Sequence, residues 1–299
     1  MTTASYRAWG IALALVGVLA FSVRPILIKL AYAYVTDPVT LIALRMVFSL
    51  PFFVAAAFWV RRDTARTPLT RRDWWAVLFL GFLGYYLASF LDFLGLQYIS
   101  AGLGRLMLFL YPTITVLLSA LFLGKYVSRR DIVALVISYA GLALVLSQGF
   151  AGENRNLMLG ALLVFGSALC YAVYLVSSSQ VVERIGSMRF TAYATSVASL
   201  LCILQFLLLR PLSALELPPQ VYALAIAMAV GCTVLPVFVT SEALRRIGAN
   251  HVAIIGAVGP VTTIFLGWLG LEESMTVLQI IGAALVLTGV SLVTIKRKN

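Results

Sequence analysis

Long apolar runs separated by short polar breaks repeat along the whole chain. Each run holds about 20 mostly apolar residues, the length that an α-helix needs to cross the hydrocarbon core of a bilayer. Charged and turn-forming residues collect in the breaks. The pattern predicts an all-α membrane protein of about ten transmembrane helices, at residues 8–31, 39–60, 74–97, 102–124, 131–148, 157–179, 189–209, 220–243, 249–271 and 276–295.

Composition agrees with this interpretation. Of the 299 residues, 62% are hydrophobic and 11% are charged, whereas a soluble domain has about 25% charged residues. So few charges cannot cover a soluble surface, and no sizeable soluble domain is expected. The first apolar run continues to about Tyr32, which is longer than the core of a signal peptide, so it is predicted to be a retained helix.

The charges in the loops predict the orientation of the chain. Cytoplasmic loops of membrane proteins carry an excess of Lys and Arg. With the N-terminus inside, the outer loops hold only Arg155 and Arg210, and the inner segments hold 16 cations. These are Arg7, Arg61, Arg62, Arg66, Arg71, Arg72, Lys125, Arg129, Arg130, Arg184, Arg189, Arg245, Arg246, Lys296, Arg297 and Lys298. Both termini are therefore expected in the cytoplasm, with the chain in a bacterial-type inner (plasma) membrane.

The distribution of positive charge also indicates which partners to expect. The net charge of +11 is spread over many short loops, which fits membrane orientation better than a phosphate-binding face. The expected partners are the lipid bilayer and a small-molecule substrate, without nucleic acid. A monomer is favoured, and a dimer is left open.

An internal repeat divides the chain into two halves. A shift of 148 positions places Pro112 on Pro260 and Gly141 on Gly289, and a shift near 150 places Gly10 on Gly160. Residues 1–148 and 149–299 would then hold five helices each and form one transmembrane domain. Because five is odd, the halves should insert with opposite orientations, and inverted repeats in transporters place the binding site between them.

The segment from Ile247 to Val290, IGANHVAIIGAVGPVTTIFLGWLGLEESMTVLQIIGAALVLTGV, resembles the last two helices of an EamA domain. That domain is the repeat unit of the drug/metabolite transporter superfamily. Its mid-helix proline, loop glutamate and glycine-punctuated last helix are matched by Pro260, Glu273, Gly282 and Gly289. The first half departs from the family pattern at Lys125, where the family usually has Glu, and the segment PVTLIALRMVFS places Arg45 at the family's arginine.

The resemblance covers nearly the whole chain. With ten predicted helices, the chain is similar in size to the amino-acid and metabolite exporters of this superfamily, which include YddG-like exporters of aromatic amino acids. The resemblance implies a cavity lined by the first, third, fourth, sixth, eighth and ninth helices. We therefore expect export of aromatic and other neutral amino acids by alternating access. A nucleotide-sugar, vitamin or lipid-linked substrate is the alternative within the superfamily.

Five charged residues fall inside the predicted spans, all in the outer half. They are Arg24, Lys29, Arg45, Asp92 and Arg105. Charges within a membrane are costly and should face water or a partner, so we expect an outward-opening, positive vestibule, with Arg24 and Arg105 as candidate partners of Asp92. The alternative is that Lys29 and Arg45, above all, extend their side chains to the outer interface.

Hydroxyl and aromatic side chains are predicted near the middle of the membrane. Tyrosine normally collects at membrane interfaces, so several tyrosines at mid-depth suggest a wet cavity, although packing is the alternative role for each. Tyr171 and Tyr174 share one helical face because they are three residues apart. The candidates are Phe21, Ser22, Tyr85, Tyr86, Ser89, Tyr111, Ser167, Tyr171, Tyr174 and Thr233. The predicted binding residues are Phe21, Ser22, Arg24, Tyr85, Tyr86, Ser89, Asp92, Arg105, Tyr111, Tyr171 and Tyr174.

Prolines within the spans remove helical hydrogen bonds and free backbone carbonyls. Pro25, Pro112, Pro236 and Pro260 are therefore candidate hinges for alternating access, with packing geometry as the alternative.

The sequence does not contain the motifs that other classes of membrane protein require. The first helix has no acid for cation–proton exchange, and the single His251 lies near the inner end of its helix. Cys170, Cys202 and Cys232 are dispersed, so neither a metal nor a cofactor is expected. No GxSxG motif or pair of intramembrane aspartates indicates a hydrolase, and no TVGYG-like filter or ring of acids indicates a channel. An enzyme is therefore not expected.

Overall fold

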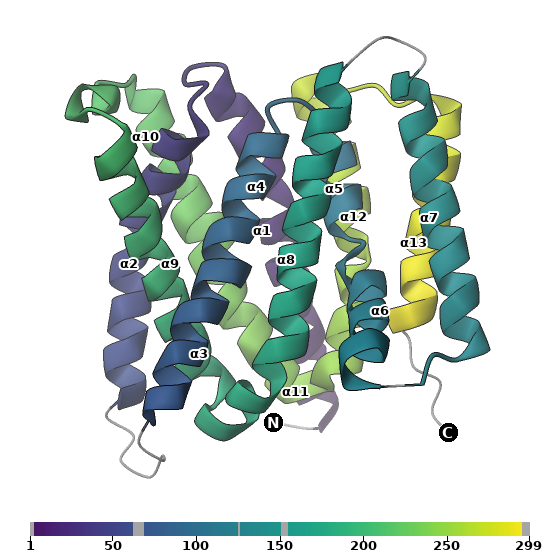
Figure 1. Ribbon diagram of the computed structural model, residues 1–299, viewed down its shortest axis with the longest axis horizontal. Helices are drawn as coiled ribbons and strands as arrows, with labels where there is room; N and C mark the ends of the chain where they lie inside the picture. Colours follow the sequence, from purple (N-terminus) through teal and green to yellow (C-terminus); the bar gives the residue numbers. More distant parts are fainter. Residues whose placement is uncertain (1–2, 62–68, 125, 151–154, 295–299) are drawn as a thin grey trace.

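The computed structural model describes residues 3–61, 69–124, 126–150 and 155–294. Within these ranges ten helical segments are long and apolar enough to cross a membrane, as the sequence predicts (Figure 1). The helices are α1 (Thr3–Tyr32), α2 (Pro38–Arg61), α3 (Arg71–Gly81), η1 (Phe82–Leu87), α4 (Ala88–Gly95), α5 (Ala101–Leu108), α6 (Tyr111–Leu123), α7 (Arg129–Phe150), α8 (Arg155–Ile185), α9 (Ser187–Leu209), η2 (Leu212–Leu215), α10 (Pro219–Ile226), η3 (Ala227–Val234), α11 (Leu235–Gly256), α12 (Val258–Leu271) and α13 (Val277–Thr294).

The start of α1 and the end of α13 lie at the same end of the bundle, which we call the terminal end (Figure 1). The loop between α1 and α2 and the start of α5 lie at the opposite end. An even number of spans requires this arrangement. Which side of the membrane the terminal end faces remains a prediction, and several of the cations on which it rests, Lys125 and Lys296 among them, lie outside the described residues.

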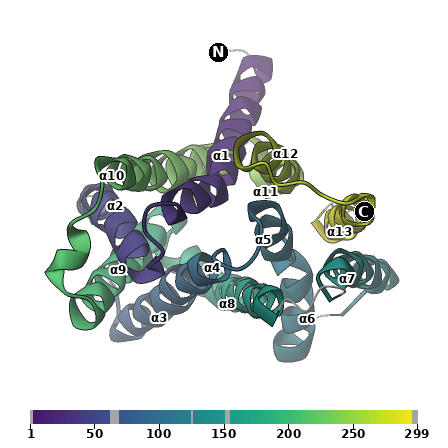
Figure 2. The same cartoon turned by 90° about the horizontal axis from the view of Figure 1, so that it is seen from above.

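The helices pair as an inverted two-fold relation between the halves requires. The second spans pack together as α2 and α9, the fourth as α5 and α12, and the fifth as α7 and α13. The first span of one half contacts the third of the other, both as α1 with α11 and as α8 with α4. Figure 2 shows α2 beside α9, α4 beside α8 and α7 beside α13.

Glycine allows the closest of these approaches. A Cβ atom on Gly141 would lie 2.6 Å from the carbonyl oxygen of Gly282, and one on Gly289 would lie 2.6 Å from that of Ala134. The two crossings of α7 and α13 are equivalent under the 148-residue shift. The helices therefore touch backbone to backbone, as small residues permit in membranes.

The ends of the last spans are also matched. Ser128 and Asp131 form reciprocal side-chain to backbone hydrogen bonds at the start of α7, and Thr276 and Gln279 do so at the start of α13. This arrangement is a capping box, which satisfies backbone N–H groups that lack helical partners. Position 128 plus the shift of 148 is 276, so the same cap begins the same helix in each half.

Two spans are interrupted where the sequence predicts a continuous helix. The fourth span is interrupted at Phe109 and Leu110, just before Pro112, and the ninth at Ala257, just before Pro260. A proline at the start of a helix has no N–H to leave unpaired, but it cannot continue the preceding helix regularly. By contrast, α1 continues through Pro25.

The third span of each half contains a π-helical segment, η1 in the first half and η3 in the second. Pro236 follows η3 directly, at the start of α11. π-Helical turns are rare and are frequently found at functional sites. Such segments have no simple periodic signature, and the sequence did not predict them.

An ion pair joins the two halves at the opposite end, outside the membrane-spanning segments. Asp37 accepts hydrogen bonds from Arg210 Nε at 2.9 Å and Arg210 Nη2 at 2.8 Å. Partial burial acts to raise the pKa of Asp37, but the hydrogen bonds from Arg210 and Thr40 outweigh it and hold that pKa below its usual value. The carboxylate also caps α2 through the Thr40 N–H, at 3.0 Å.

Candidate functional site

Four of the predicted intramembrane charges meet in the half of the bundle nearer the opposite end. They are Arg24 on α1, Arg45 on α2, Asp92 on α4 and Arg105 on α5, and we call them the charged centre. Their residues are only 7%, 1%, 3% and 9% exposed. The expected open vestibule is therefore closed in this structure, because neighbouring helices cover these side chains.

Asp92 pairs with one of its two predicted partners. Its Oδ2 atom accepts a hydrogen bond from Arg24 Nη2 at 2.7 Å, and both side chains are buried. A buried pair is retained only where the geometry compensates for the lost hydration. Arg105 makes no ion pair with a described carboxylate.

All three guanidinium groups lie over aromatic rings. The Cζ atoms of Arg24 and Arg105 are each 4.5 Å from the centroid of Phe21, and that of Arg45 is 4.8 Å from the centroid of Phe93. The Nε atoms of all three arginines lack a hydrogen-bond partner among the described residues. Three cations face one carboxylate, so the charged centre has a net charge of +2.

Aromatic contacts do not offset this charge. A cation–π contact contributes about 0.5–2 kcal/mol, whereas an arginine at the centre of a spanning helix costs about 2.5–3.5 kcal/mol on insertion scales. Arg45 cannot gain hydration by extending to the interface, since it is almost fully buried; Lys29 is only half-buried. The charged centre therefore retains attraction for an anion.

Four tyrosines from three elements form a second group, which we call the tyrosine cluster. The rings of Tyr171 and Tyr174 stack at 5.6 Å, so they share a face as predicted. Tyr111 meets Tyr171 edge-on at 5.0 Å. Tyr85 meets Tyr174 at 5.2 Å, and their hydroxyl oxygens are 3.1 Å apart.

The tyrosine cluster adjoins the charged centre through Arg105. The hydroxyl groups of Tyr111 and Tyr171 are within electrostatic range of the Arg105 guanidinium. Tyr111 also begins α6, immediately after the break that separates it from α5. One interrupted span thus supplies both an unpaired cation and an aromatic ring.

Two predicted binding residues, Tyr86 and Ser89, lie outside these two groups. Tyr86 stacks on Phe90 at 6.4 Å and packs in the cluster of apolar residues between α2 and α9. It points away from Tyr85 because adjacent helical positions face different directions. Ser89, half-buried on α4, forms no hydrogen bond to the charged centre or the tyrosine cluster among the described residues.

The remaining hydroxyls serve the backbone. Ser22 donates to the carbonyl of Val18 within its own helix, at 2.6 Å. Ser167 donates to the carbonyl of Ala88 at 2.6 Å and so joins α8 to α4. Thr233 donates to Met228 within η3, at 2.9 Å. These groups position helices.

Sequence reasoning missed two residues beside the charged centre, both on α12. Thr263 is fully buried and donates to the carbonyl of Ser22 at 2.8 Å, which holds α12 against α1. A Cβ atom on Gly259 would lie 3.2 Å from Arg105 Nη2, so glycine leaves that guanidinium room. A glycine directly before Pro260 could have been noticed, whereas a lone threonine in an apolar helix carries no signal.

Glu273 has a structural contact that the sequence did not predict. Its carboxylate accepts the N–H groups of Ala101 at 2.8 Å and Gly102 at 3.3 Å, at the start of α5. A carboxylate is favoured at a helix N-terminus, so the loop after α12 holds the helix that carries Arg105. The position equivalent to Glu273 in the first half is Lys125, a cation that cannot accept such bonds.

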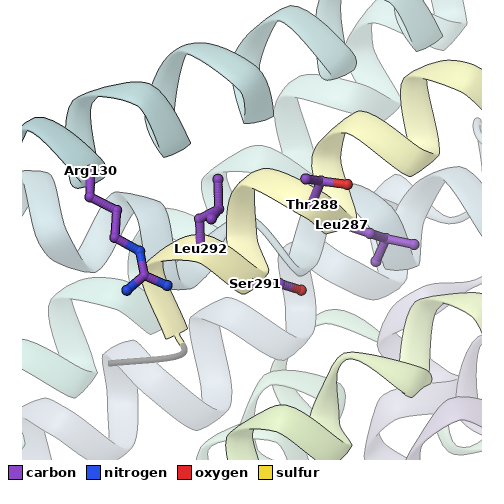
Figure 3. Close-up of a pocket in the computed structure, with 5 residues that line it drawn as sticks. All are labelled: Arg130, Leu287, Thr288, Ser291 and Leu292. Carbon is purple, nitrogen blue, oxygen red and sulfur yellow. The ribbon is translucent and has the colours of Figure 1, made fainter. Parts of the chain in front are cut away.

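Two surface pockets lie away from the charged centre and the tyrosine cluster. One of about 350 Å³ lies between α7 and α13, and Figure 3 shows Arg130 reaching from α7 toward the last turns of α13. It contains none of the predicted binding residues. A second, of about 310 Å³, lies between α6 and α8 and is lined by Leu118, Phe122, Leu123, Val173, Val176 and Ser177. It lies about two helical turns from Tyr111 toward the terminal end.

Comparison with known proteins agrees with the architecture. Residues 8–147 and, again, residues 158–295 match the EamA-like transporter family. The chain is 31% identical over 273 residues to the uncharacterized transporter YcbK of Bacillus subtilis, covering 90% of this chain and 87% of that one. It is 25% identical to the uncharacterized transporter sll1319 of Synechocystis, covering 86% and 79%.

A crystal structure with 20% sequence identity shares the fold, with a TM-score of 0.65 and 95% of both chains covered. The two family matches are separated by residues 148–157, and each spans five of the ten candidate membrane helices. With its polytopic helical bundle and these matches over both halves, the chain belongs to the EamA-like transporter family.

Proposed function

We propose that this transporter exports amino acids, aromatic ones and other neutral ones, across a bacterial inner membrane. The family and its named relatives support a carrier of the drug/metabolite type. The observation that carries the narrower proposal is that Arg105, which has no ion-pair partner among the described residues, lies within electrostatic range of Tyr111 and Tyr171 in the tyrosine cluster. A carboxylate and an aromatic ring on one small molecule match these two neighbours.

Alternating access is the mechanism that suits this arrangement. The breaks before Pro112 and Pro260 are equivalent under the 148-residue shift, and the π-helical segments η1 and η3 overlap under it. Interrupted helices in inverted repeats provide both free backbone carbonyls and bending points. In this proposal, α5 and α12 tilt at these breaks and expose the tyrosine cluster to each side in turn.

Liposome transport of the purified protein tests the proposal. Labelled L-phenylalanine is offered with and without an imposed pH gradient, and unlabelled amino acids compete. Stacking between rings contributes about 0.5–1.5 kcal/mol beyond area burial, and 1.4 kcal/mol corresponds to a factor of ten. Phenylalanine, tyrosine and tryptophan should therefore compete about tenfold better than glycine or serine.

A double substitution checks the role of the cluster. Tyr171→Ala with Tyr174→Ala should remove most of the preference for aromatic competitors, because two stacked rings are lost. Tyr86→Ala is the matched control, since that tyrosine packs between α2 and α9, and it should keep the preference. Aromatic amino acids that compete no better than glycine would refute the proposal.

A further inference from the structure

In the described part of the chain, the membrane interior offers cations for a carboxylate but no free acid for an ammonium group. Asp92 is the only acid in the charged centre, and Arg24 occupies it. Among the described residues, the other acids of the spanning helices lie toward the terminal end. They are Asp73, paired with Arg184; Asp131, held by Ser128; Glu183, which is exposed; and Glu242, paired with Arg245 and Arg246.

The excess of cations over free acids in this region should favour one kind of aromatic ligand over another. An amino acid carries an α-ammonium group beside its carboxylate, and that ammonium would enter a region whose net charge is already +2. Like charges at short range in a poorly hydrated site repel strongly. An aromatic acid without the amino group supplies the missing negative charge and adds no positive one.

We infer that the charged centre and the tyrosine cluster form a binding site for aromatic carboxylates without an α-ammonium group, with Arg105 as the residue that binds the carboxylate. The inference rests on the proposed function, in that it assigns transport to the same region. For the same site it assigns a preferred substrate class that differs from aromatic amino acids, namely deaminated or 2-oxo aromatic acids.

Arg105 is better placed for this role than the other two arginines. Arg24 already donates to Asp92. Arg45 is 1% exposed and lies over Phe93, within electrostatic range of Cys202 and away from the tyrosines. Arg105 makes no ion pair among the described residues, and its Nη2 atom lies against Gly259, where a Cβ atom would be only 3.2 Å away.

Three ligands with the same ring separate the possibilities. L-Phenylalanine has both charged groups, 3-phenylpropanoate has only the carboxylate, and phenethylamine has only the ammonium. Their binding to the detergent-purified protein is measured by the shift in its thermal unfolding temperature, which avoids passive leak of the weak acid through lipid. Competition against labelled L-phenylalanine in liposomes is measured in parallel.

We expect 3-phenylpropanoate to bind and compete about tenfold better than L-phenylalanine, and phenethylamine not to compete. Arg105→Gln should abolish the advantage of 3-phenylpropanoate, while Arg105→Lys keeps part of it by preserving the charge. Arg130→Gln, in the distant pocket of Figure 3, is the control and should keep the full advantage.

The outcomes separate this inference from the proposed function. If L-phenylalanine is transported and binds as well as 3-phenylpropanoate or better, the inference is overturned and the proposed function stands. If neither compound binds or is transported, the proposed function fails and the inference fails with it. If the Arg105 variants do not fold, comparing 3-phenylpropanoate with L-phenylalanine on the unaltered protein still tests the inference.

Discussion

At the scale of single residues, the charged centre concentrates the unusual chemistry of this protein. Arg24 and Asp92 come from different helices and meet at 2.7 Å in a part of the bundle that neighbouring helices cover. The pair compensates one positive charge of three. Its carboxylate therefore limits the repulsion among the arginines and should be needed for the fold as well as for transport.

The first stability prediction concerns this pair. Asp92→Asn leaves three buried guanidinium groups without a carboxylate, and breaking a buried pair at one partner typically costs about 3–5 kcal/mol. Thermal unfolding of the purified protein in detergent should shift to lower temperature. Adding Arg24→Gln to the same chain should recover part of the loss, since the unpaired cation is removed. An Asp92→Asn protein as stable as the parent would show that the pair does not support the fold.

At the scale of helices, the two halves repeat their local features closely. The capping boxes at Ser128 and Thr276, the breaks before Pro112 and Pro260, and the glycine crossings of α7 and α13 all correspond under one shift of 148 positions. The last spans of the two halves, α7 and α13, pack on each other along this glycine contact. They carry no residue of the charged centre or the tyrosine cluster.

The helix contact can be tested with one methyl group. In Gly282→Ala the new Cβ atom would lie 2.7 Å from the carbonyl oxygen of Gly141, a backbone atom that cannot rotate away. Overpacking of this kind costs about 1–3 kcal/mol. Gly270→Ala, on exposed α12 with nothing within 4 Å of the added atom, is the matched control and should be near neutral. Equal unfolding temperatures for the two variants would contradict the close contact.

At the scale of the whole molecule, the ten spans bring the start of α1 and the end of α13 to one end of the bundle. The charged centre and the Glu273 contact lie toward the other end. If the terminal end is cytoplasmic, as the loop cations predict, this structure is closed toward the outside. The pocket between α6 and α8 then lies on the cytoplasmic side of the tyrosine cluster.

Reporter fusions test this orientation. A reporter that is active only in the cytoplasm, placed after Asn299, should be active, and one placed in the loop after Arg210 should be inactive. A periplasm-specific reporter at the same two positions should give the reverse pattern. An active cytoplasmic reporter after Arg210 would overturn the orientation and the direction of transport with it.

Much of the architecture could be predicted because the bilayer allows few solutions. Backbone groups in hydrocarbon must be hydrogen-bonded within the chain, so apolar runs of the right length become spanning helices. The number of spans, the positions of the helix-breaking prolines and the shared face of Tyr171 and Tyr174 follow from residue type and spacing alone. The resemblance to the EamA domain could also be recognised from the sequence, because it rests on the positions of Pro260, Glu273 and the glycines of the last helix.

Tertiary structure alone decided which residues meet. Periodicity shows the face on which a side chain lies but not the depth and rotation of the helix opposite. Asp92 could have paired with Arg24 or Arg105, and only the tertiary arrangement brought Arg24 to it and left Arg105 without an ion-pair partner among the described residues. Tyr86 and Ser89 matched the same composition as the binding residues, yet the helix around η1 turns Tyr86 toward α2 and α9. The net charge of the charged centre, on which the substrate class depends, is a property of this packing.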